Sequence, residues 1–172
     1  RRLFVVVDNQ ADRALTADDF AATAAECDGA LITPSNRIDA ALLARCPRLR
    51  VVSNIGVGYD HIDVAACTAR SVLVTNTPGV VDGATADLTW ALILAACRRI
   101  VEADRYVRAG EWAANPQPFL GQQVHGATLG VLGFGRIGQA VARRAAGFDM
   151  TVLYHQPRRA ATDVESACNV SF

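Results

Sequence analysis

The fold is decided by residues 128–139, TLGVLGFGRIGQ. The first five of these residues are apolar or β-branched and predict a strand, which runs into the glycine-rich turn Gly133 to Gly138. Gln139 to Ala146 predict a helix, and Gly147 is placed to end it in a left-handed conformation. Met150 to Tyr154 predict the next strand. The stretch therefore predicts a βαβ unit with two parallel strands.

Each glycine of the turn has its own physical role if the unit binds a dinucleotide. Gly133 permits the tight turn, Gly135 lets the backbone approach a pyrophosphate, and Gly138 lets the helix pack on the strand. The first N–H groups of the helix and their partial positive charge attract phosphate. The alternative is a glycine-rich turn that binds nothing, but the strand before the turn and the helix after it favour dinucleotide binding.

The residues after the second strand bear on the choice of dinucleotide. A site for NAD places a carboxylate here, on the ribose hydroxyls, yet the segment 154–159 reads YHQPRR and no acid occurs before Asp163. Arg158 and Arg159 stand where a 2′-phosphate would lie, and guanidinium binds phosphate well. We therefore expect NADP(H) to be favoured over NAD(H), with His155 as a neighbour of the adenosine. The alternative is a solvated arginine pair on a surface loop.

Residues 1–79 also alternate short apolar strands with helices. Strands are predicted at 3–7, 30–33, 50–54 and 72–75, and helices at 17–27, 38–44 and 63–69. This alternation predicts a second set of parallel βαβ units and an α/β fold throughout. Residues 82–108 predict one helix about 40 Å long. The proline-containing stretch 112–121 predicts an irregular connection.

A second glycine cluster, Asn54 to Asp60, follows one of these strands. Parallel sheets bind ligands at the carboxyl ends of their strands, and two glycines leave N–H groups accessible to a small carboxylate. A tight turn without a ligand is an equally good interpretation.

His61 and His125 have no acid or nucleophile beside them in sequence, so we interpret them as surface or packing residues. Asp60 and Asp63 are candidate helix caps.

Composition excludes several classes of function. The 172 residues carry 17 basic and 17 acidic side chains, and this balance argues against a nucleic-acid partner. Every basic residue is arginine, which excludes a Schiff-base or P-loop lysine. No apolar run approaches the roughly 20 residues of a membrane span. The five isolated cysteines predict buried thiols in a reducing compartment, without a disulfide framework or a metal site.

Four segments together resemble the D-isomer-specific 2-hydroxyacid dehydrogenase family. They are residues 51–63, residues 74–79 with 85–87, residues 108–112, and the cofactor motif 128–139. The resemblance spans nearly the whole chain, with the four motifs in the family's order. Residues 154–159 look most like the glyoxylate and hydroxypyruvate reductase branch.

The resemblance implies a flavodoxin-like substrate domain in residues 1–79 and a Rossmann-type dinucleotide-binding domain in residues 80–172, both incomplete. Backbone N–H groups of Val57 and Gly58 would hold the substrate carboxylate. The remaining positions implied to touch the cofactor fall into three groups. The pyrophosphate would lie on Phe134, Gly135, Arg136 and Ile137, the adenosine 2′ position between Gln156 and Arg158, and Thr85 near the cofactor.

The implied activity is hydride transfer between NADP(H) and a small 2-keto acid, in a cytoplasmic homodimer. The family's arginine, glutamate and histidine lie in its second half, so we expect them beyond residue 172 and assign no catalytic residue here. We accordingly expect the chain to be an internal piece of a longer enzyme. The alternatives are an NAD-dependent phosphoglycerate or D-lactate-type dehydrogenase and, from another class, a dinucleotide-sensing corepressor on the same scaffold.

Overall fold

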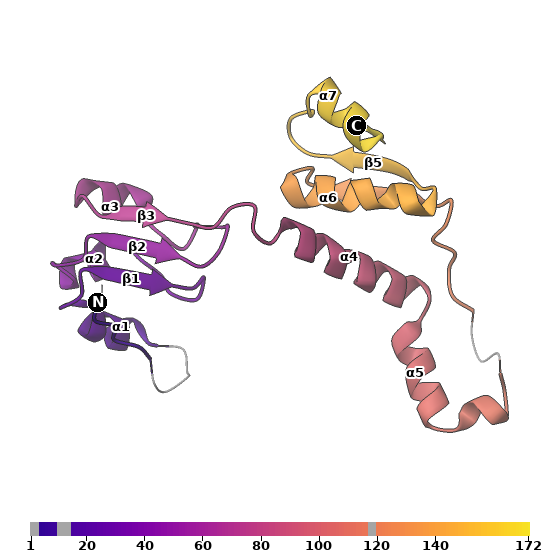
Figure 1. Cartoon of the computed structure of the whole chain (residues 1–172), viewed down its shortest axis with the longest axis horizontal. Coiled ribbons are helices and arrows are strands. Elements are labelled where there is room, and N and C mark those ends of the chain that lie inside the picture. Colours follow the sequence, from indigo (N-terminus) through magenta and orange to yellow (C-terminus); the bar gives the residue numbers. More distant parts are fainter. Residues whose placement is uncertain (1–3, 10–14, 117–119) are drawn as a thin grey trace. The chain divides into compact units, whose positions relative to one another are not determined.

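The computed structural model describes residues 4–9, 15–116 and 120–172. The chain forms two compact units, Arg1–Gly79 and Val80–Phe172. Each unit is built on its own three-stranded parallel sheet with helices packed on it (Figure 1). The predicted α/β class is therefore confirmed.

The sheet of the first unit has the order β1-β2-β3. Its strands are β1 (Gly29–Ile32), β2 (Val51–Asn54) and β3 (Leu73–Thr75), and its helices are α1 (Ala17–Ala24), α2 (Ala40–Arg45) and α3 (Val64–Ala69). Because the strands are parallel and in close register, the loops that follow them lie together at the carboxyl end of the sheet. The loop after β2 meets the neighbouring segments there, through Ile55 N–H to the Ile32 carbonyl and Thr77 N–H to the Gly56 carbonyl.

Side-chain caps fix where the helices of this unit begin. Thr16 Oγ1 accepts from the Asp19 N–H at 3.1 Å, and Asp63 Oδ1 accepts from the Ala66 N–H at 2.9 Å. The cap predicted at Asp63 is thus confirmed. The core between helices and sheet is apolar, and its least exposed large side chains include Ile32, Leu43 and Val52.

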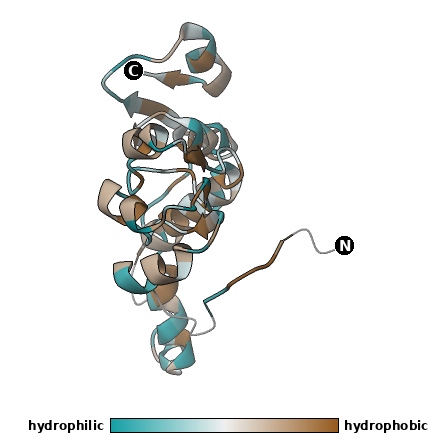
Figure 2. Ribbon diagram, turned by 90° about the vertical axis from the view of Figure 1, so that its left-hand side faces the viewer, coloured by the Kyte–Doolittle hydropathy of each residue, from teal (hydrophilic) through white to brown (hydrophobic). Residues whose placement is uncertain are grey.

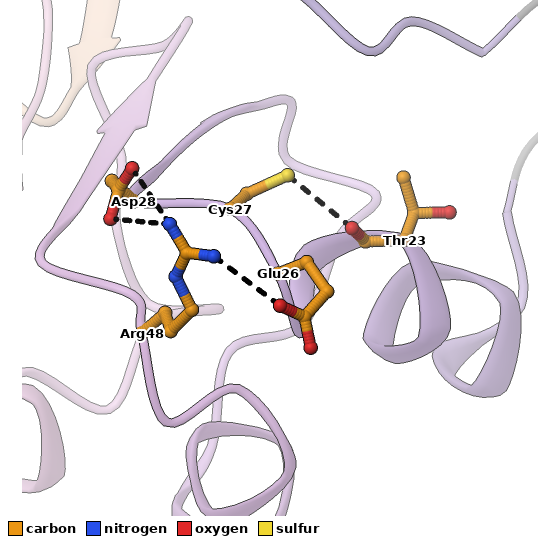
Figure 3. A network of polar contacts seen from close by, with 5 residues as sticks. All are labelled: Thr23, Glu26, Cys27, Asp28 and Arg48. Atoms are coloured by element: carbon orange, nitrogen blue, oxygen red, sulfur yellow. Dashed lines mark hydrogen bonds and ion pairs between the residues drawn. The ribbon is translucent and has the colours of Figure 1, made fainter.

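A surface network joins the loop before β1 to the loop before β2 (Figure 3). Arg48 lies between two carboxylates, 3.3 Å from Glu26 and 3.4 Å from Asp28, and the Cys27 thiol donates to the Thr23 carbonyl at 3.3 Å. All the charged partners are more than half exposed, so the network contributes little to stability.

The strand predicted at residues 3–7 is wrong over residues 4–7, and residue 3 lies outside the described part of the chain. Phe4, Val5, Val6 and Val7 are 62–96% exposed, and the stretch appears brown in Figure 2 because its side chains are hydrophobic. β-propensity alone does not make a strand, since the backbone also needs a neighbouring strand with which to pair. The described residues supply none for this segment.

The sheet of the second unit has the order β4-β5-β6. Its strands are β4 (Thr128–Leu132), β5 (Thr151–His155) and β6 (Val170–Ser171). Its helices are α4 (Asp82–Cys97), α5 (Ile100–Arg108), α6 (Arg136–Ala145) and α7 (Thr162–Cys168), with short 3-10 turns at Glu111–Ala113 and Ala146–Phe148. Among the described residues β4 pairs only with β5, so its other edge is free.

The single helix predicted over residues 82–108 is wrong, because the chain breaks between α4 and α5. Arg99 adopts a left-handed conformation with φ +53°. The Gln122 N–H donates to the Cys97 carbonyl at 2.7 Å, and Gly121 packs so closely on Cys97 and Arg98 that a Cβ there would not fit. A carbonyl that would have continued the helical ladder is thus taken by a residue more than twenty positions away.

Two boundaries near the glycine motif also differ from expectation. Helix α6 begins at Arg136, inside the motif, and Gly147 does not take the left-handed position. That conformation falls on Asp149, with φ +51°, after the short turn Ala146–Phe148. Trp90 of α4 packs in the core against α6. Its indole N–H donates to the Val141 carbonyl at 3.0 Å, and its ring stacks on Phe148.

All five cysteines are free thiols. Cys46, Cys67 and Cys168 are buried, whereas Cys27 and Cys97 are partly exposed. Burial raises the pKa of the Cys46 and Cys67 thiols, so both remain protonated and unreactive near neutral pH. Of the helices that the structure describes, none combines the length and apolar character that a bilayer crossing requires.

Candidate dinucleotide and carboxylate sites

The glycine turn between β4 and α6 has the geometry that its sequence predicts. Gly133 lies at φ +90°, a conformation that L side chains rarely adopt, and its N–H donates to the His155 carbonyl at 2.8 Å. A Cβ on Gly138 would overlap the carbonyl oxygen of Gly133. These two glycines are therefore required by the fold, whether or not a ligand binds.

Gly135 is different, because a Cβ on it would meet nothing within 4 Å. It is the N-cap residue of α6, and no side chain caps that helix. The first N–H groups of a helix have no partner within it, so those of Arg136 and Ile137 are available to a ligand. An open cradle with exposed N–H donors fits a pyrophosphate, as the sequence predicts.

Both the ring and the N–H of Phe134 make contacts within the protein. Its ring is buried and stacks on Tyr154 at 4.3 Å between centroids. Its N–H donates to Gln156 Oε1 at 3.0 Å, which commits both groups to each other. Gln139 Nε2 also donates to the Phe134 carbonyl at 3.2 Å. The N–H groups left for a pyrophosphate are thus those of Gly135 to Ile137. Gln156 stabilises the loop through its hydrogen bond with Phe134.

The two arginines after β5 have separate environments. Arg159 makes a bidentate pair with Glu165, Nε to Oε1 and Nη2 to Oε2, both at 2.9 Å. Glu165 is buried, and it also accepts from the Tyr154 hydroxyl at 2.6 Å. Arg158 is exposed. Arg159 is therefore held in an ion pair on α7, which leaves Arg158 as the guanidinium available to a 2′-phosphate.

The second glycine cluster, in the first unit, forms a loop that begins at the buried Asn54. The Asn54 amide donates to the carbonyls of Gly56 and Gly58, at 3.2 and 2.8 Å. Asn76 Nδ2 donates to the Val57 carbonyl at 2.9 Å. Val57 is half-buried and Gly58 exposed, and neither N–H has a hydrogen bond to another described residue. The loop thus presents free donors to a small anion.

The matching protein-family model describes the NAD-binding domain of the D-isomer specific 2-hydroxyacid dehydrogenases, and it covers residues 90–172. Residues 90–172 of the chain belong to this dehydrogenase family. It is 54% identical over 136 residues to the glyoxylate reductase of Thermococcus kodakarensis, covering 76% of this chain and 41% of that protein. Identity is 50% over 149 residues to the glyoxylate reductase of Thermococcus onnurineus, covering 83% and 44%. The chain spans less than half the length of these curated relatives.

A solved structure agrees with the family assignment. A Polaromonas protein assigned to the D-isomer specific 2-hydroxyacid dehydrogenases superposes with a TM-score of 0.84 and 38% identity. The match covers 92% of this chain and 50% of that one. The expected resemblance to the glyoxylate reductase branch is confirmed.

The remaining predicted site residues of this dehydrogenase-family chain lie as follows. Thr85 is half-buried in the first turn of α4, where its carbonyl accepts from Thr89 Oγ1 at 2.8 Å. His155 ends β5 and stacks on Phe172, with 6.1 Å between ring centroids. A hollow of about 390 Å³ is lined by residues of β4, α4 and the first part of α6.

The histidines set aside at the sequence level have partners in the structure. His61 Nε2 lies 3.2 Å from Asn54 Oδ1. His125 Nδ1 lies 3.5 Å from a carboxylate oxygen of Asp149, and both side chains are more than 60% exposed. Among the described residues no cluster of three or more histidine, cysteine or acidic side chains is placed to hold a metal ion.

Three residues with clear roles were missed by sequence reasoning. Asn54 and Asn76 carried only the weak signal of a polar residue at the end of an apolar strand. Glu165 follows Thr162 at the spacing typical of a capping box, and this spacing predicts that Glu165 binds the backbone N–H at the start of a helix. Helix α7 is in fact capped by no side chain, and Glu165 binds Tyr154 and Arg159 instead.

The cluster around Glu165 makes a prediction about acid stability. Hydrogen bonds from Arg159 and then Tyr154 lower the pKa of the Glu165 carboxyl in the folded chain. Its stabilisation is therefore complete above the unfolded carboxyl pKa of about 4.3 and is lost as pH falls through the lower folded value. We expect Glu165→Gln to reduce stability at pH 7 and to flatten the loss of stability between about pH 5 and pH 3.

Urea unfolding at a series of pH values measures this effect. Glu26→Gln is the matched control, because Glu26 also pairs with an arginine but its side chain is 83% exposed. The control should keep the acid slope of the unmodified chain. An unchanged slope in Glu165→Gln would contradict the role given to the buried carboxylate.

Proposed function

We propose that this chain is part of an NADP(H)-dependent reductase of a small 2-keto acid such as glyoxylate or hydroxypyruvate. The observation that carries the proposal is the open, uncapped start of α6 beside Gly135, in a chain about half identical to two glyoxylate reductases. A bound nicotinamide cofactor would supply the hydride, and the protein would position both reactants.

The proposed roles of the residues follow from their donors. The N–H groups of Gly135, Arg136 and Ile137 would hold the pyrophosphate, with Gly133 and Gly138 shaping the turn. The N–H groups of Val57 and Gly58 would hold the substrate carboxylate. Thr85 and His155 are proposed as cofactor neighbours. No proton donor is assigned among the described residues.

The cellular context is also part of the proposal. Five free thiols fit a reducing compartment such as the cytoplasm. Leu88 and Leu92 lie one turn apart on α4, and each is 61% exposed. An exposed apolar stripe of this kind fits a protein–protein contact, so we propose a homodimer.

The preference for NADP(H) rests on Arg158 and on the absence of an acid at the end of β5. One charge-assisted hydrogen bond to a phosphate contributes about 1.5–3 kcal/mol, and solvent exposure favours the lower value. We therefore expect a preference for NADPH over NADH of at least roughly tenfold, which Arg158→Ala should remove. Adding His155→Asp should reverse it, because aspartate accepts from a free ribose hydroxyl and repels a 2′-phosphate.

The measurement is kcat/KM for each cofactor, with glyoxylate as substrate, in the longer enzyme of which this chain is proposed to be a part. Arg105→Ala serves as the control, since Arg105 is an exposed arginine on α5, outside the loop after β5. It should leave the ratio unchanged. If the unmodified enzyme already prefers NADH, the NADP(H) assignment is wrong while the hydride-transfer assignment stands.

A further inference from the structure

Three consecutive carbonyls of the loop after β2 are turned to the same set of amide groups. The Gly56 carbonyl accepts from Asn54 Nδ2 and from the Thr77 N–H, at 3.2 and 3.0 Å. The Val57 carbonyl accepts from Asn76 Nδ2 at 2.9 Å, and the Gly58 carbonyl from Asn54 Nδ2 at 2.8 Å. Asn54 ends β2 and Asn76 follows β3, so the two amides come from adjacent strands of one sheet.

The direction of these carbonyls fixes the direction of the N–H groups. In a planar trans peptide the N–H of the next residue points opposite to the carbonyl, and the described chain has no cis peptide bond. The N–H groups of Val57, Gly58 and Tyr59 therefore point away from the two asparagines. None of the three makes a hydrogen bond with another described residue.

Both hydrogens of the Asn54 side-chain amide are used in hydrogen bonds, and this determines which ring nitrogen of His61 carries a proton. Asn54 is 0% exposed, and its Nδ2 has two hydrogens for two carbonyls. Its Oδ1 is then left as an acceptor, and the group facing it is His61 Nε2 at 3.2 Å. His61 must therefore carry a proton on Nε2 to satisfy this buried oxygen.

We propose that His61, Asn54 and Asn76 are positioning residues that hold the three N–H groups of Val57, Gly58 and Tyr59 as a preformed carboxylate site. The inference rests on the proposed function for the carboxylate, and it adds Tyr59 N–H as a third donor. Donors fixed before the ligand arrives need no reorganisation when it binds, which is where a loop of this kind gains affinity.

The packing of the loop agrees with a fixed conformation. A Cβ on Gly56 would lie 3.2 Å from Asn54 Nδ2 and 3.3 Å from Pro34 Cγ, both tighter than an ordinary contact. A glycine at this position lets the Asn54 amide approach the backbone closely. The alternative is that Asn54 only satisfies a buried turn and that the direction of the N–H groups has no consequence for binding.

The test is an NMR titration of the ¹⁵N-labelled 172-residue chain with sodium glyoxylate, at a protein concentration below the onset of self-association. Ionic strength is held constant, and sodium chloride provides the reference anion. In the unmodified chain the amide signals of Val57, Gly58 and Tyr59 should move together with one dissociation constant. Asn54→Leu should weaken that constant at least roughly tenfold, because the donors lose their fixed direction. The imidazole ¹⁵N shifts should place the proton of His61 on Nε2, and this preference should disappear in Asn54→Leu.

Two further variants keep the result interpretable. Asn76→Ala removes only the donor to the Val57 carbonyl, from a half-buried position, and should weaken glyoxylate binding even if Asn54→Leu does not fold. Thr75→Val is the control, since it removes the bond from Thr75 Oγ1 to Ser53 Oγ at the same sheet edge without touching the loop. It should leave both the dissociation constant and the His61 tautomer unchanged.

The outcomes separate this inference from the function on which it rests. Unchanged glyoxylate binding in Asn54→Leu or Asn76→Ala would overturn the positioning role and leave the carboxylate site in place. A proton on Nδ1 of His61 would overturn it as well. If the three amides of the unmodified chain do not respond to glyoxylate although His61 carries its proton on Nε2, the carboxylate site itself is wrong.

Discussion

Replacing Gly135 by valine is expected to lower the affinity for NADPH at least roughly tenfold, or about 1.4 kcal/mol, while the fold survives. A Cβ at this position meets nothing within 4 Å, so the protein itself has room for the side chain. The backbone of Gly135, at φ −77° and ψ −164°, is extended and open to valine. The branched side chain therefore obstructs only the space through which a pyrophosphate would pass.

Titration of NADPH by its fluorescence, with thermal unfolding measured on the same samples, checks this result. Gly135→Ala provides a graded comparison and should fall between the parent and the valine variant. Unaltered NADPH binding in Gly135→Val would remove this turn from the proposed cofactor site. A large drop in melting temperature would instead mean that the open space beside Gly135 is required by the fold.

Gly138→Ala should have the opposite outcome, a loss of stability in place of a specific loss of binding. The added methyl would overlap the Gly133 carbonyl oxygen, a backbone atom that can move only with the turn. Overpacking of this kind costs about 1–3 kcal/mol, and we expect the upper value because no flexible side chain can yield. For a unit of this size that corresponds to a fall in melting temperature of roughly 10 °C or more.

The matched control is Gly130→Ala. Gly130 lies in β4, just before the same turn, and a Cβ there meets nothing within 4 Å. Thermal unfolding followed by circular dichroism should show little change for this variant. Equal melting temperatures for Gly138→Ala and the parent would contradict the close packing of helix on strand.

The parts of the fold that were predictable from sequence depend on local signals. The strand β4 was placed residue for residue, because its apolar run ends directly at the glycines. Thr16 and Asp63 begin helices where a capping side chain predicts it. The roles of Gly133 and Gly138 were also predictable, since they follow from backbone geometry alone.

The errors occurred where a distant residue decides the outcome. The break at Arg99 depends on the approach of Gln122 to the Cys97 carbonyl, which periodicity within the helix cannot reveal. Strand β6 was missed because Val170–Ser171 is too short to show a pattern and becomes a strand by pairing with β5. Apolar residues 4–7 showed the reverse error, a strong local signal for which the described part of the chain provides no neighbouring strand.

In the candidate site, too, local motifs were predictable from sequence and contacts between distant residues were not. The N–H donors near Gly135 belong to a motif with a fixed mechanism, so the spacing of its glycines is enough to predict them. The commitment of Arg159 to Glu165 and of Gln156 to the Phe134 N–H depends on side-chain contacts between β5, α7 and the glycine turn. An arginine pair in sequence therefore overstated the positive charge available to a 2′-phosphate.

The free edge of β4 has a consequence for how the purified chain behaves in solution. Unpaired N–H and C=O groups along a strand are a template for another strand, and Leu132 at its end is 88% exposed. Natural edges are often protected by lysine, yet this chain contains none, and its net charge of zero provides no long-range repulsion between molecules. At high concentration we therefore expect the isolated chain to self-associate through this edge and to be poorly soluble.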